Sequence, residues 1–412
     1  MPKIIPFRAV RPTRDKVGLI AARSYQSYSE SQRNARLETN PFSFLHIVNP
    51  GYKYKKEISG PERYELVRNR YQEFKEEGYF VHDEEPVFYL HKIVNRNEEV
   101  FYGIVGAASV ADYENNLIKK HEDTLADRED TFKEYLDTVG FNAEPVLLAY
   151  PDNKVLQDIY EKISKKRAEY EFTTTYRDTH YLWIINNEKD IAEIEKQFSK
   201  MNEMYIADGH HRSASSFLLS KDKQEENSEH NGKESYNFFM SYCIPESHLI
   251  IHEFNRLVKD LNGLSKEEFL IKLDTYFRIE NLGDVYYKPS KKGHFSMYLD
   301  GDFYSLYLRK NKYQYSDALS KLDVQILYET VLKPILGIED LRNDERISYA
   351  HGKGEMASVK GYVDSGEFAV GFGMLPSTIE EVKQIADENL VMPPKATYIE
   401  PKLRSGITIY EF

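Results

Sequence analysis

Apolar runs of strand length alternate with helical patterns along this whole chain, and the alternation limits its possible folds more than any other feature. Apolar side chains recur at helical spacing over 60–80, with a proline near the start. Two β-rich runs follow at 86–94 and 99–110, joined by a short polar turn that is typical of a hairpin. Because strands and helices interleave in this way, the sequence predicts a mixed α/β or α+β fold.

The chain is long enough for two or three domains, because it has 412 residues. Within it, the apolar run 42–48 predicts a strand, and the polar stretch 112–138 is predicted to be mostly helical. The stretch 220–235 contains no apolar residue and is typical of a mobile loop. We expect four segments: an N-terminal α/β segment (1–110), a central core (111–220), a mobile loop (221–235) and a C-terminal α+β region (236–412).

Charge and cysteine content limit the possible partners and compartment. The 67 acidic residues exceed the 55 Lys and Arg residues, and the net charge of −12 repels nucleic acid and anionic membranes. Cys243 is the sole cysteine, so no internal disulfide can form. The N-terminus lacks the apolar core of a signal peptide, and no window approaches the roughly 20 apolar residues of a membrane span. We therefore expect a soluble cytoplasmic protein that binds neither nucleic acid nor membranes.

The stretch MYIADGHHRSA, residues 204–214, gathers four polar side chains and a glycine behind a short apolar run. The apolar run predicts a strand, Asp208 and Gly209 a bend, and the following residues a helix. Free backbone N–H groups at such a helix start attract an anion, and Arg212 could add a bidentate contact. Each residue alone also fits a structural role: Asp208 would cap the helix, His210 and His211 would hydrogen-bond a neighbouring loop, and Arg212 would be a surface charge. Together they favour a ligand site.

Metal binding is the alternative for this stretch, because it contains adjacent histidines. Consecutive helical residues point about 100° apart, so His210 and His211 do not easily bind one ion. His248 and His252 have the spacing of a helical zinc site, but their segment is strand-like and lacks the accompanying glutamate. The sequence thus disfavours zinc. Mg²⁺ held by Asp208 and a nucleotide's phosphates stays open, because Mg²⁺ needs only one or two carboxylates.

Two further clusters could carry chemistry. The segment 118–130 contains His121 and Glu122, and a glutamate in a dry cleft or beside positive groups can act as a general base. An ordinary solvated helix face explains the same residues, and no spacing brings Glu122 near Asp208. The proline-rich segment 392–406 predicts a fixed path, either as a strap over a cleft or as a packed terminus. Its candidate contact residues are Lys395, Thr397, Tyr398 and Lys402.

Several widespread motifs are absent. The chain contains no GxxxxGK[ST] phosphate loop, no GxGxxG after a strand and no GxSxG nucleophile elbow. The common nucleotide-binding folds and the serine hydrolases are therefore disfavoured.

The motifs described above resemble, along nearly the whole chain, those of the bacterial and archaeal proteins that contain domain of unknown function 1015. The matching pieces occur in the family's order: NPFSFLHIV, IKKHEDT, YIADGHHR, LDVQILYETVLKPILGI and MPPKATYIEPKLRSG. Because the family is largely uncharacterised, this resemblance identifies relatives but no activity.

The pair HE and DGHHR is also similar to motifs of the free serine kinases in the ParB and sulfiredoxin superfamily. This similarity implies a ParB/sulfiredoxin-like nucleotide-binding core in segment 111–220, elaborated by additional mixed-sheet and helical segments. It also implies transfer of phosphate from ADP or ATP, with Mg²⁺, to a hydroxyl compound such as serine. Glu122 would then be the base and His121 its neighbour. Phosphate and Mg²⁺ would be held by Asp208, Gly209, His210, His211 and Arg212.

The chain departs from the family pattern at three places. The family's Lys-Glu-x-Asp-Arg run after the HE motif is blurred to ADREDTFKE, residues 126–134. The family's Pro-Tyr-Asp near the N-terminus is Ser24-Tyr25-Gln26 here, and the serine of its C-terminal PKST is Ala396. A non-catalytic nucleotide-binding regulator of the ParB type therefore remains the alternative to a kinase. The acceptor, the choice among ADP, ATP and CTP, the oligomeric state and the histidine that contacts ligand stay open.

Overall fold

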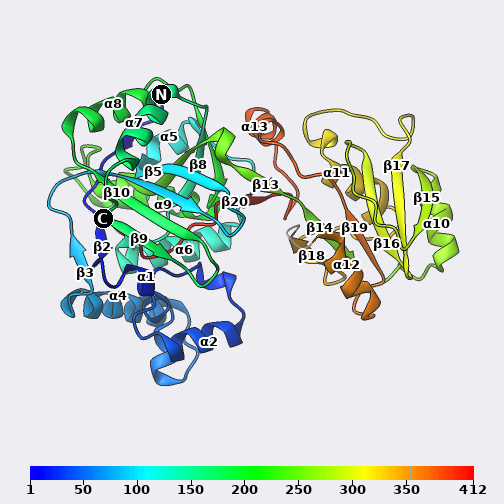
Figure 1. The fold of residues 1–412 in the computed structure, drawn as a ribbon, viewed down its shortest axis with the longest axis horizontal. Coiled ribbons are helices and arrows are strands. Elements are labelled where there is room, and N and C mark those ends of the chain that lie inside the picture. The colour runs from blue at the N-terminus through cyan, green and yellow to red at the C-terminus, as the bar shows by residue number, and fades with distance from the viewer. Residues whose placement is uncertain (352–354) are drawn as a thin grey trace. The chain divides into compact units, whose positions relative to one another are not determined.

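The structure is a computed structural model that describes residues 1–351 and 355–412, and its chain forms two compact units (Figure 1). Both units combine sheets with helices, which confirms the predicted mixed α/β class. Unit 1 comprises residues 1–120, 124–249 and 401–412, and unit 2 comprises 121–123 and 250–400.

Unit 1 is built on a nine-stranded mixed sheet with the order β6-β11-β8-β12-β5-β4-β10-β9, and β1 pairs with β5. Its strands are β1 (Ile4–Ile5), β4 (Phe88–Val94), β5 (Val100–Ser109), β6 (Ile118–Lys119), β8 (Val146–Tyr150), β9 (Tyr170–Thr173), β10 (Thr179–Ile185), β11 (Met204–Asp208) and β12 (Phe238–Pro245). The pairs β11–β6 and β12–β8 are parallel and the other pairs are antiparallel. The predicted hairpin at 86–110 is confirmed as β4 and β5.

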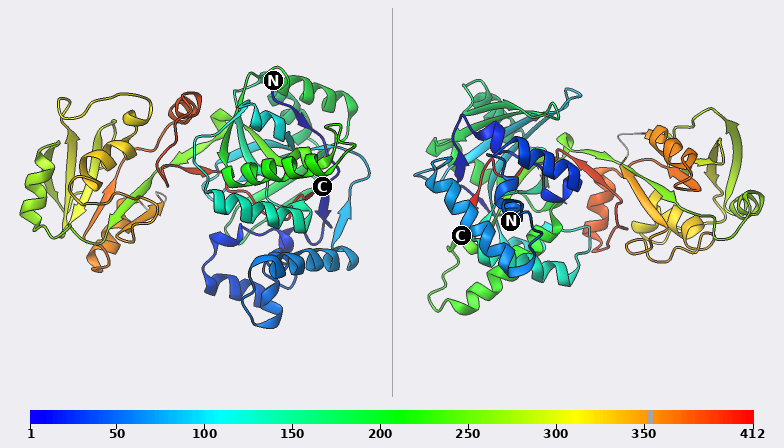
Figure 2. Two further views of the ribbon diagram at one scale, coloured as in Figure 1. Left: turned by 180° about the vertical axis from the view of Figure 1, so that it is seen from behind. Right: turned by 90° about the horizontal axis from the view of Figure 1, so that it is seen from below.

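Helices cover this sheet, and α6 and α9 lie side by side across it (Figure 2). The helices of unit 1 are α1 (Val17–Ile20), α2 (Glu30–Thr39), α3 (Leu45–Val48), α4 (Gly60–Glu76), α5 (Val110–Glu114), α6 (Ala126–Val139), α7 (Lys154–Ser164), α8 (Glu188–Phe198) and α9 (His210–Glu226). Two short pairs complete the unit: β2 (Val10–Pro12) with β3 (Phe80–His82), and β7 (Phe141–Asn142) with β21 (Tyr410–Glu411).

Unit 2 contains a six-stranded sheet with the order β15-β17-β16-β19-β14-β18, and β13 pairs separately with β20. Its strands are β13 (Ile250–His252), β14 (Phe254–Val258), β15 (Phe277–Gly283), β16 (His294–Leu299), β17 (Asp302–Leu308), β18 (Ile347–His351), β19 (Val370–Gly373) and β20 (Tyr398–Glu400). Its helices are α10 (Lys266–Asp274), α11 (Asp323–Leu327), α12 (Glu355–Asp364) and α13 (Ile379–Asp387).

Two secondary-structure predictions were wrong. Residues 45–48 of the predicted strand 42–48 form helix α3, because a mainly apolar run this short has no period that separates strand from helix. Within 112–138, strand β6 interrupts the expected helix, and α6 starts only at Ala126. Strand β6 forms because Ile118 is buried against Met204 in the sheet.

The expected segments do not coincide with the compact units. Strands from 1–110, from 111–220 and from 238–245 share one sheet, so hydrogen bonds cross the expected boundaries. Residues 221–226 belong to helix α9 rather than to a loop. This polar helix end forms ion pairs: Lys221 Nζ lies 2.6 Å from a carboxylate oxygen of Glu114, and Lys223 Nζ lies 2.8 Å from one of Asp137.

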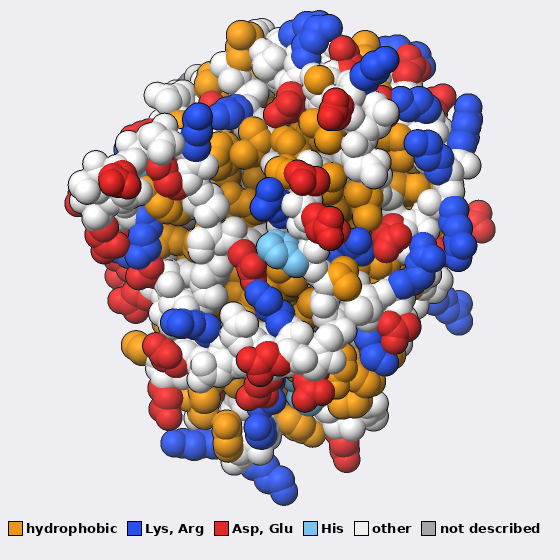
Figure 3. Space-filling model, turned by 90° about the vertical axis from the view of Figure 1, so that its left-hand side faces the viewer, with side chains coloured by type: hydrophobic (Ala, Val, Ile, Leu, Met, Phe, Trp, Pro, Cys, Tyr) orange, Lys and Arg blue, Asp and Glu red, His pale blue; other side chains and the backbone are white. Residues whose placement is uncertain are grey.

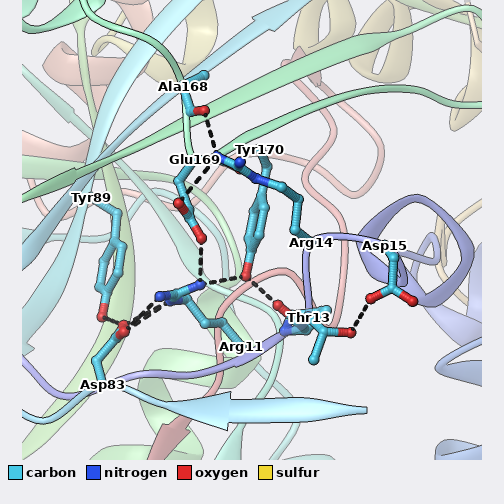
Figure 4. Close-up of polar contacts among 10 residues, drawn as sticks. Arg11, Thr13, Arg14, Asp15, Asp83, Tyr89, Ala168, Glu169 and Tyr170 are labelled. Carbon is cyan, nitrogen blue, oxygen red and sulfur yellow. Dashed lines mark hydrogen bonds and ion pairs between the residues drawn. The ribbon is translucent and has the colours of Figure 1, made fainter.

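Arg11, whose side chain is 12% exposed, joins the N-terminal strand β2 to the large sheet (Figure 4). The Arg11 guanidinium donates to both carboxylate oxygens of Asp83, at 2.9 and 3.0 Å, and to Tyr170 Oη at 2.9 Å. Glu169 accepts a further bond at 3.1 Å, and Tyr89 Oη donates to Asp83 at 2.6 Å. Because its donors are satisfied by protein groups, Arg11 has a structural role.

Charged side chains of both signs are interspersed over one face of the molecule, around an apolar area (Figure 3). This face therefore presents no continuous basic stripe among its described residues, the usual footprint of a nucleic-acid site. Within the described ranges, no helix combines the length and apolar character needed to cross a membrane.

Buried histidines should make the stability of unit 1 depend on pH. His91 Nε2 and His180 Nδ1 lie 3.0 Å apart, and both side chains are buried. Burial lowers the pKa of His91 to about 3, and burial together with the charges of His91 and Arg404 lowers the pKa of His180 well below its usual value. The unfolded chain binds these protons below about pH 6.5, whereas the folded unit does not. The free energy of unfolding should therefore decrease as the pH is lowered below 6.5, by up to about 1.4 kcal/mol per pH unit for each histidine.

The single tryptophan, Trp183 in β10, reports this unit, so urea unfolding followed by its fluorescence at pH 7, 6 and 5 measures the effect. The double variant His91→Gln/His180→Gln should show a flatter pH dependence. Equal slopes for the wild type and the double variant would contradict the prediction.

Candidate functional site

The stretch 204–214 forms the predicted strand, turn and helix start. Strand β11 lies between β6 and β8 and ends at Asp208, and helix α9 starts at His210. Gly209 joins them with φ 102° and ψ 28°, a left-handed conformation that L residues rarely adopt. The glycine therefore allows the chain to turn sharply from the end of β11 into the helix.

The N-terminus of α9 has no side-chain cap. Gly209 occupies the N-cap position and has no side chain that could cap the helix. Asp208 lies just ahead of the helix and does not occupy the N-cap position. Exposed N–H groups and the helix dipole make such an end attractive to an anion.

Asp208 is ionised at this turn. Lys402 Nζ lies 3.2 Å from Asp208 Oδ2, and the two side chains are 37% and 42% exposed. Partial burial opposes ionisation of Asp208, but the positive charges of Lys402 and Arg212 outweigh it and hold its pKa below the usual value. The contact joins residues far apart in sequence, because the C-terminal segment returns to unit 1 through Ser405, which pairs with Ala22.

Arg212 is held by a carboxylate that the sequence did not suggest. It forms an ion pair with Glu144, and its Nη2 donates to the carbonyl of Pro145 at 3.4 Å. Ser405 Oγ also donates to Glu144, at 3.2 Å. Arg212 Nε is buried and has no hydrogen-bond partner among the described residues. The side chain is therefore fixed while one of its donors remains available.

The two adjacent histidines have different surroundings. His210 is only 4% exposed, and burial lowers its pKa to about 3, so its ring is neutral at neutral pH. The positive charges of Arg212 and Lys120 also lower this pKa, whereas Asp208 raises it. His211 is half-buried, and its ring centroid lies 6.4 Å from that of Phe132. The turn thus carries the positive charges of Arg212, Lys402 and Lys120 and the negative charges of Asp208 and Glu144, beside a neutral imidazole.

His121 and Glu122 belong to unit 2. The His121 side chain is fully buried, and its backbone carbonyl accepts a hydrogen bond from Met392 N at 2.9 Å. The Glu122 side chain is 43% exposed, and its Oε1 lies 4.0 Å from His121 Nε2. This arrangement supplies a solvent-accessible carboxylate beside a buried imidazole.

The predicted strap residues fall in different units. Lys402 is in unit 1 and contacts Asp208, as described. Lys395, Thr397 and Tyr398 are in unit 2. There the Lys395 carbonyl accepts from Arg256 Nη2 at 3.1 Å, Thr397 is half-buried, and Tyr398 begins strand β20.

Gly209→Ala is expected to destabilise the protein by about 1–2 kcal/mol, because L residues adopt the left-handed conformation at a cost. The added Cβ would also lie 2.9 Å from Arg212 Nη2 and 3.0 Å from Nε, so Arg212 would have to move. Urea unfolding followed by Trp183 fluorescence measures the change. Gly18→Ala is the control: that glycine lies in helix α1, where a Cβ comes no closer than 3.4 Å to Phe172. Equal stability of the two variants would contradict the strain at Gly209.

Comparison with known proteins gives one family and several remote structural similarities. The model of a family described as "Protein of unknown function (DUF1015)" matches residues 4–325, so the C-terminal motif at 392–406 lies outside the match. No curated protein matches the chain.

The similar solved structures include a mutant "Free serine kinase" in complex with AMP, at 11% identity and a TM-score of 0.36; 74% of this chain and 92% of that chain are covered. "SbnI with C-terminal truncation from Staphylococcus aureus" has 13% identity and a TM-score of 0.38, covering 74% and 85%. A "Conserved hypothetical protein from Pyrococcus furiosus" has 13% identity and a TM-score of 0.33, covering 74% and 94%. Because all three TM-scores lie below 0.5, these similarities carry no argument about the site.

Proposed function

We propose that this chain, which belongs to the DUF1015 family of proteins of unknown function, is a small-molecule phosphotransferase whose β11–α9 turn binds the phosphates of ADP or ATP. The observation that carries the proposal is the uncapped start of α9, with Arg212 and Lys402 beside it. Backbone N–H groups and fixed positive charges are the groups that stabilise phosphate oxygens.

Asp208 fits the predicted role of Mg²⁺ ligand. Its pKa is held below the usual value, its side chain is 42% exposed, and Lys402 contacts it at Oδ2. An oxygen ligand of this kind suits Mg²⁺, which is usually held by one or two carboxylates together with substrate phosphates. A bound Mg²⁺ would offset the negative charge of the nucleotide.

The family resemblance supplies Glu122 as the base. In the proposed step the acceptor's hydroxyl proton passes to the Glu122 carboxylate, and the hydroxyl oxygen forms a bond to phosphorus. The bond between that phosphorus and the nucleotide's leaving oxygen breaks, and the nucleotide leaves with one phosphate fewer. Because phosphoryl transfer depends mainly on positioning and charge stabilisation, Arg212 and Lys402 would hold the phosphates during this step.

The test is a transfer assay with purified protein, Mg²⁺ and either ADP or ATP. Serine, threonine and related hydroxyl compounds are offered as acceptors, and phosphorus NMR detects new phosphate esters. We expect one nucleotide to support ester formation with an acceptor of this class. If no acceptor is phosphorylated with either nucleotide, while the protein binds neither of them, the proposal fails.

A non-catalytic nucleotide-binding regulator is the second candidate, favoured by the departures at Gln26 and Ala396. Ala396 is 2% exposed and packs in the core of unit 2. A methyl group therefore occupies the position of the family's serine hydroxyl. Calorimetry separates the candidates, because a regulator should bind ADP or ATP without forming any ester.

A further inference from the structure

Three arginines from separate parts of unit 1 converge on one tyrosine ring. The guanidinium carbons of Arg23, Arg36 and Arg404 lie 3.4, 5.1 and 5.3 Å from the ring centroid of Tyr176. Arg23 follows helix α1, Arg36 is in α2, and Arg404 is in the C-terminal segment. Tyr176 lies in the loop between β9 and β10. We call these four residues the Tyr176 cluster.

The Tyr176 cluster has more positive charge than its protein partners balance. Among the described residues, its one ion pair joins Arg404 Nη2 to Asp178 Oδ2, at 2.7 Å. Arg36 Nη2 donates to the neutral hydroxyl of Thr175, at 2.8 Å. The Arg23 guanidinium contacts the Tyr176 ring and has no hydrogen-bond partner among the described residues. Three guanidinium groups therefore share one carboxylate, and like charges held this closely repel each other.

A buried polar atom without a partner among the described residues belongs to this cluster. The Arg404 side chain is only 3% exposed, yet its Nε has no hydrogen-bond partner in the described part of the chain. His180 Nε2 is likewise buried and unpartnered, and the charge of Arg404 contributes to the lowered pKa of His180. Burial and the nearby charge of Arg23 also lower the pKa of Arg404. Unsatisfied buried donors are costly, so an acceptor that reaches them would be bound favourably.

We propose that the Tyr176 cluster is a second anion-binding site, which takes the carboxylate or phosphate group of a small molecule. The planar fork of arginine matches both groups, because each offers two oxygens to parallel N–H donors. Arg23, Arg36 and Tyr176 are half-buried, so the site is open to a small solute, while buried Arg404 forms its base. The inference does not rest on the proposed function and would hold if the β11–α9 turn bound no nucleotide.

Calorimetric titration of the full-length protein tests the site with two probes, inorganic phosphate and L-serine. Arg23→Gln is the main variant, because Arg23 loses no protein hydrogen bond and the fold should be kept. Binding of at least one probe should weaken about tenfold or more in this variant, as expected for loss of a charged hydrogen bond. Arg68→Gln, which removes an exposed arginine of α4, is the matched control and should bind like the wild type.

Comparison of the two probes shows whether the site prefers a phosphate or a carboxylate group. Tighter binding of phosphate would indicate a phosphate-bearing ligand, and tighter binding of L-serine would indicate a carboxylate. If neither probe binds the wild type, or if Arg23→Gln binds both as the wild type does, the inference is overturned.

Titration with ADP distinguishes the second anion site from the proposed nucleotide site at the β11–α9 turn. Arg23→Gln should bind ADP as the wild type does, because its change lies outside the β11–α9 turn. An equal loss of ADP and probe binding in Arg23→Gln would assign Arg23 to the nucleotide site and overturn the second site. Loss of transfer activity alone would leave the anion site standing.

Discussion

Replacing Glu122 with glutamine is expected to slow phosphate transfer by about 10²–10⁴-fold, because the amide cannot accept the proton of the acceptor hydroxyl. The Glu122 side chain is 43% exposed, so the loss of its charge should leave the fold intact. Affinity for ADP should change little, because the phosphates are proposed to bind at the β11–α9 turn. Initial rates of ester formation and calorimetric titration with ADP measure the two effects separately.

Asp123→Asn is the matched control for this substitution. Asp123 is the next residue in the chain, is 59% exposed and lies 3.6 Å from Arg342 Nη1. The control removes the same charge from the same segment and should keep the wild-type rate. A Glu122→Gln variant with full activity, or equal losses in both variants, would show that Glu122 is not the base.

Arg212→Ala is expected to weaken ADP binding about tenfold or more, because a charged hydrogen bond to phosphate is lost. It should also lower the free energy of unfolding by about 1–3 kcal/mol, because the partly buried Glu144 loses its ion-pair partner. Arg212→Lys should give an intermediate affinity, because lysine keeps the charge but loses the planar fork. Calorimetry and urea unfolding followed by Trp183 fluorescence measure the two effects.

A double variant separates binding from stability at Arg212. Adding Glu144→Gln to Arg212→Ala removes the unpaired carboxylate, so stability should recover in part while ADP affinity stays low. Arg96→Ala removes an exposed arginine from the β4–β5 turn and is the control for general charge effects. Wild-type ADP affinity in Arg212→Ala would exclude Arg212 from the nucleotide site.

The strand, turn and helix start at 204–214 could be predicted because their causes are local. The apolar run, the glycine and the helical period that follows are each encoded within a few residues. Helix α3 shows the limit of this reasoning, since the four residues 45–48 are too few to show whether their period is that of a strand or of a helix. The polar end of α9 shows a second limit: composition suggested a loop, but residues 221–226 are helical and form ion pairs with Glu114 and Asp137.

The surroundings of the turn could not be predicted, because they come from distant parts of the chain. Glu144 precedes strand β8, and its ion pair with Arg212 forms only because β8 and β11 are neighbours in the sheet. The Tyr176 cluster also forms only in the tertiary structure, since its arginines are at positions 23, 36 and 404. No local pattern marks such residues, because each of them alone is an ordinary charged or polar side chain.

By itself, the sequence determined the mixed α/β class, the family and the shape of the β11–α9 turn. These depend on periodicity, on the conformational freedom of glycine and on motif order, all of which are written along the chain. Only the tertiary structure decided which charges surround that turn and which arginines meet at Tyr176. The physical reason is that charge interactions depend on distance in space, and sheet pairing and the returning C-terminal segment set those distances.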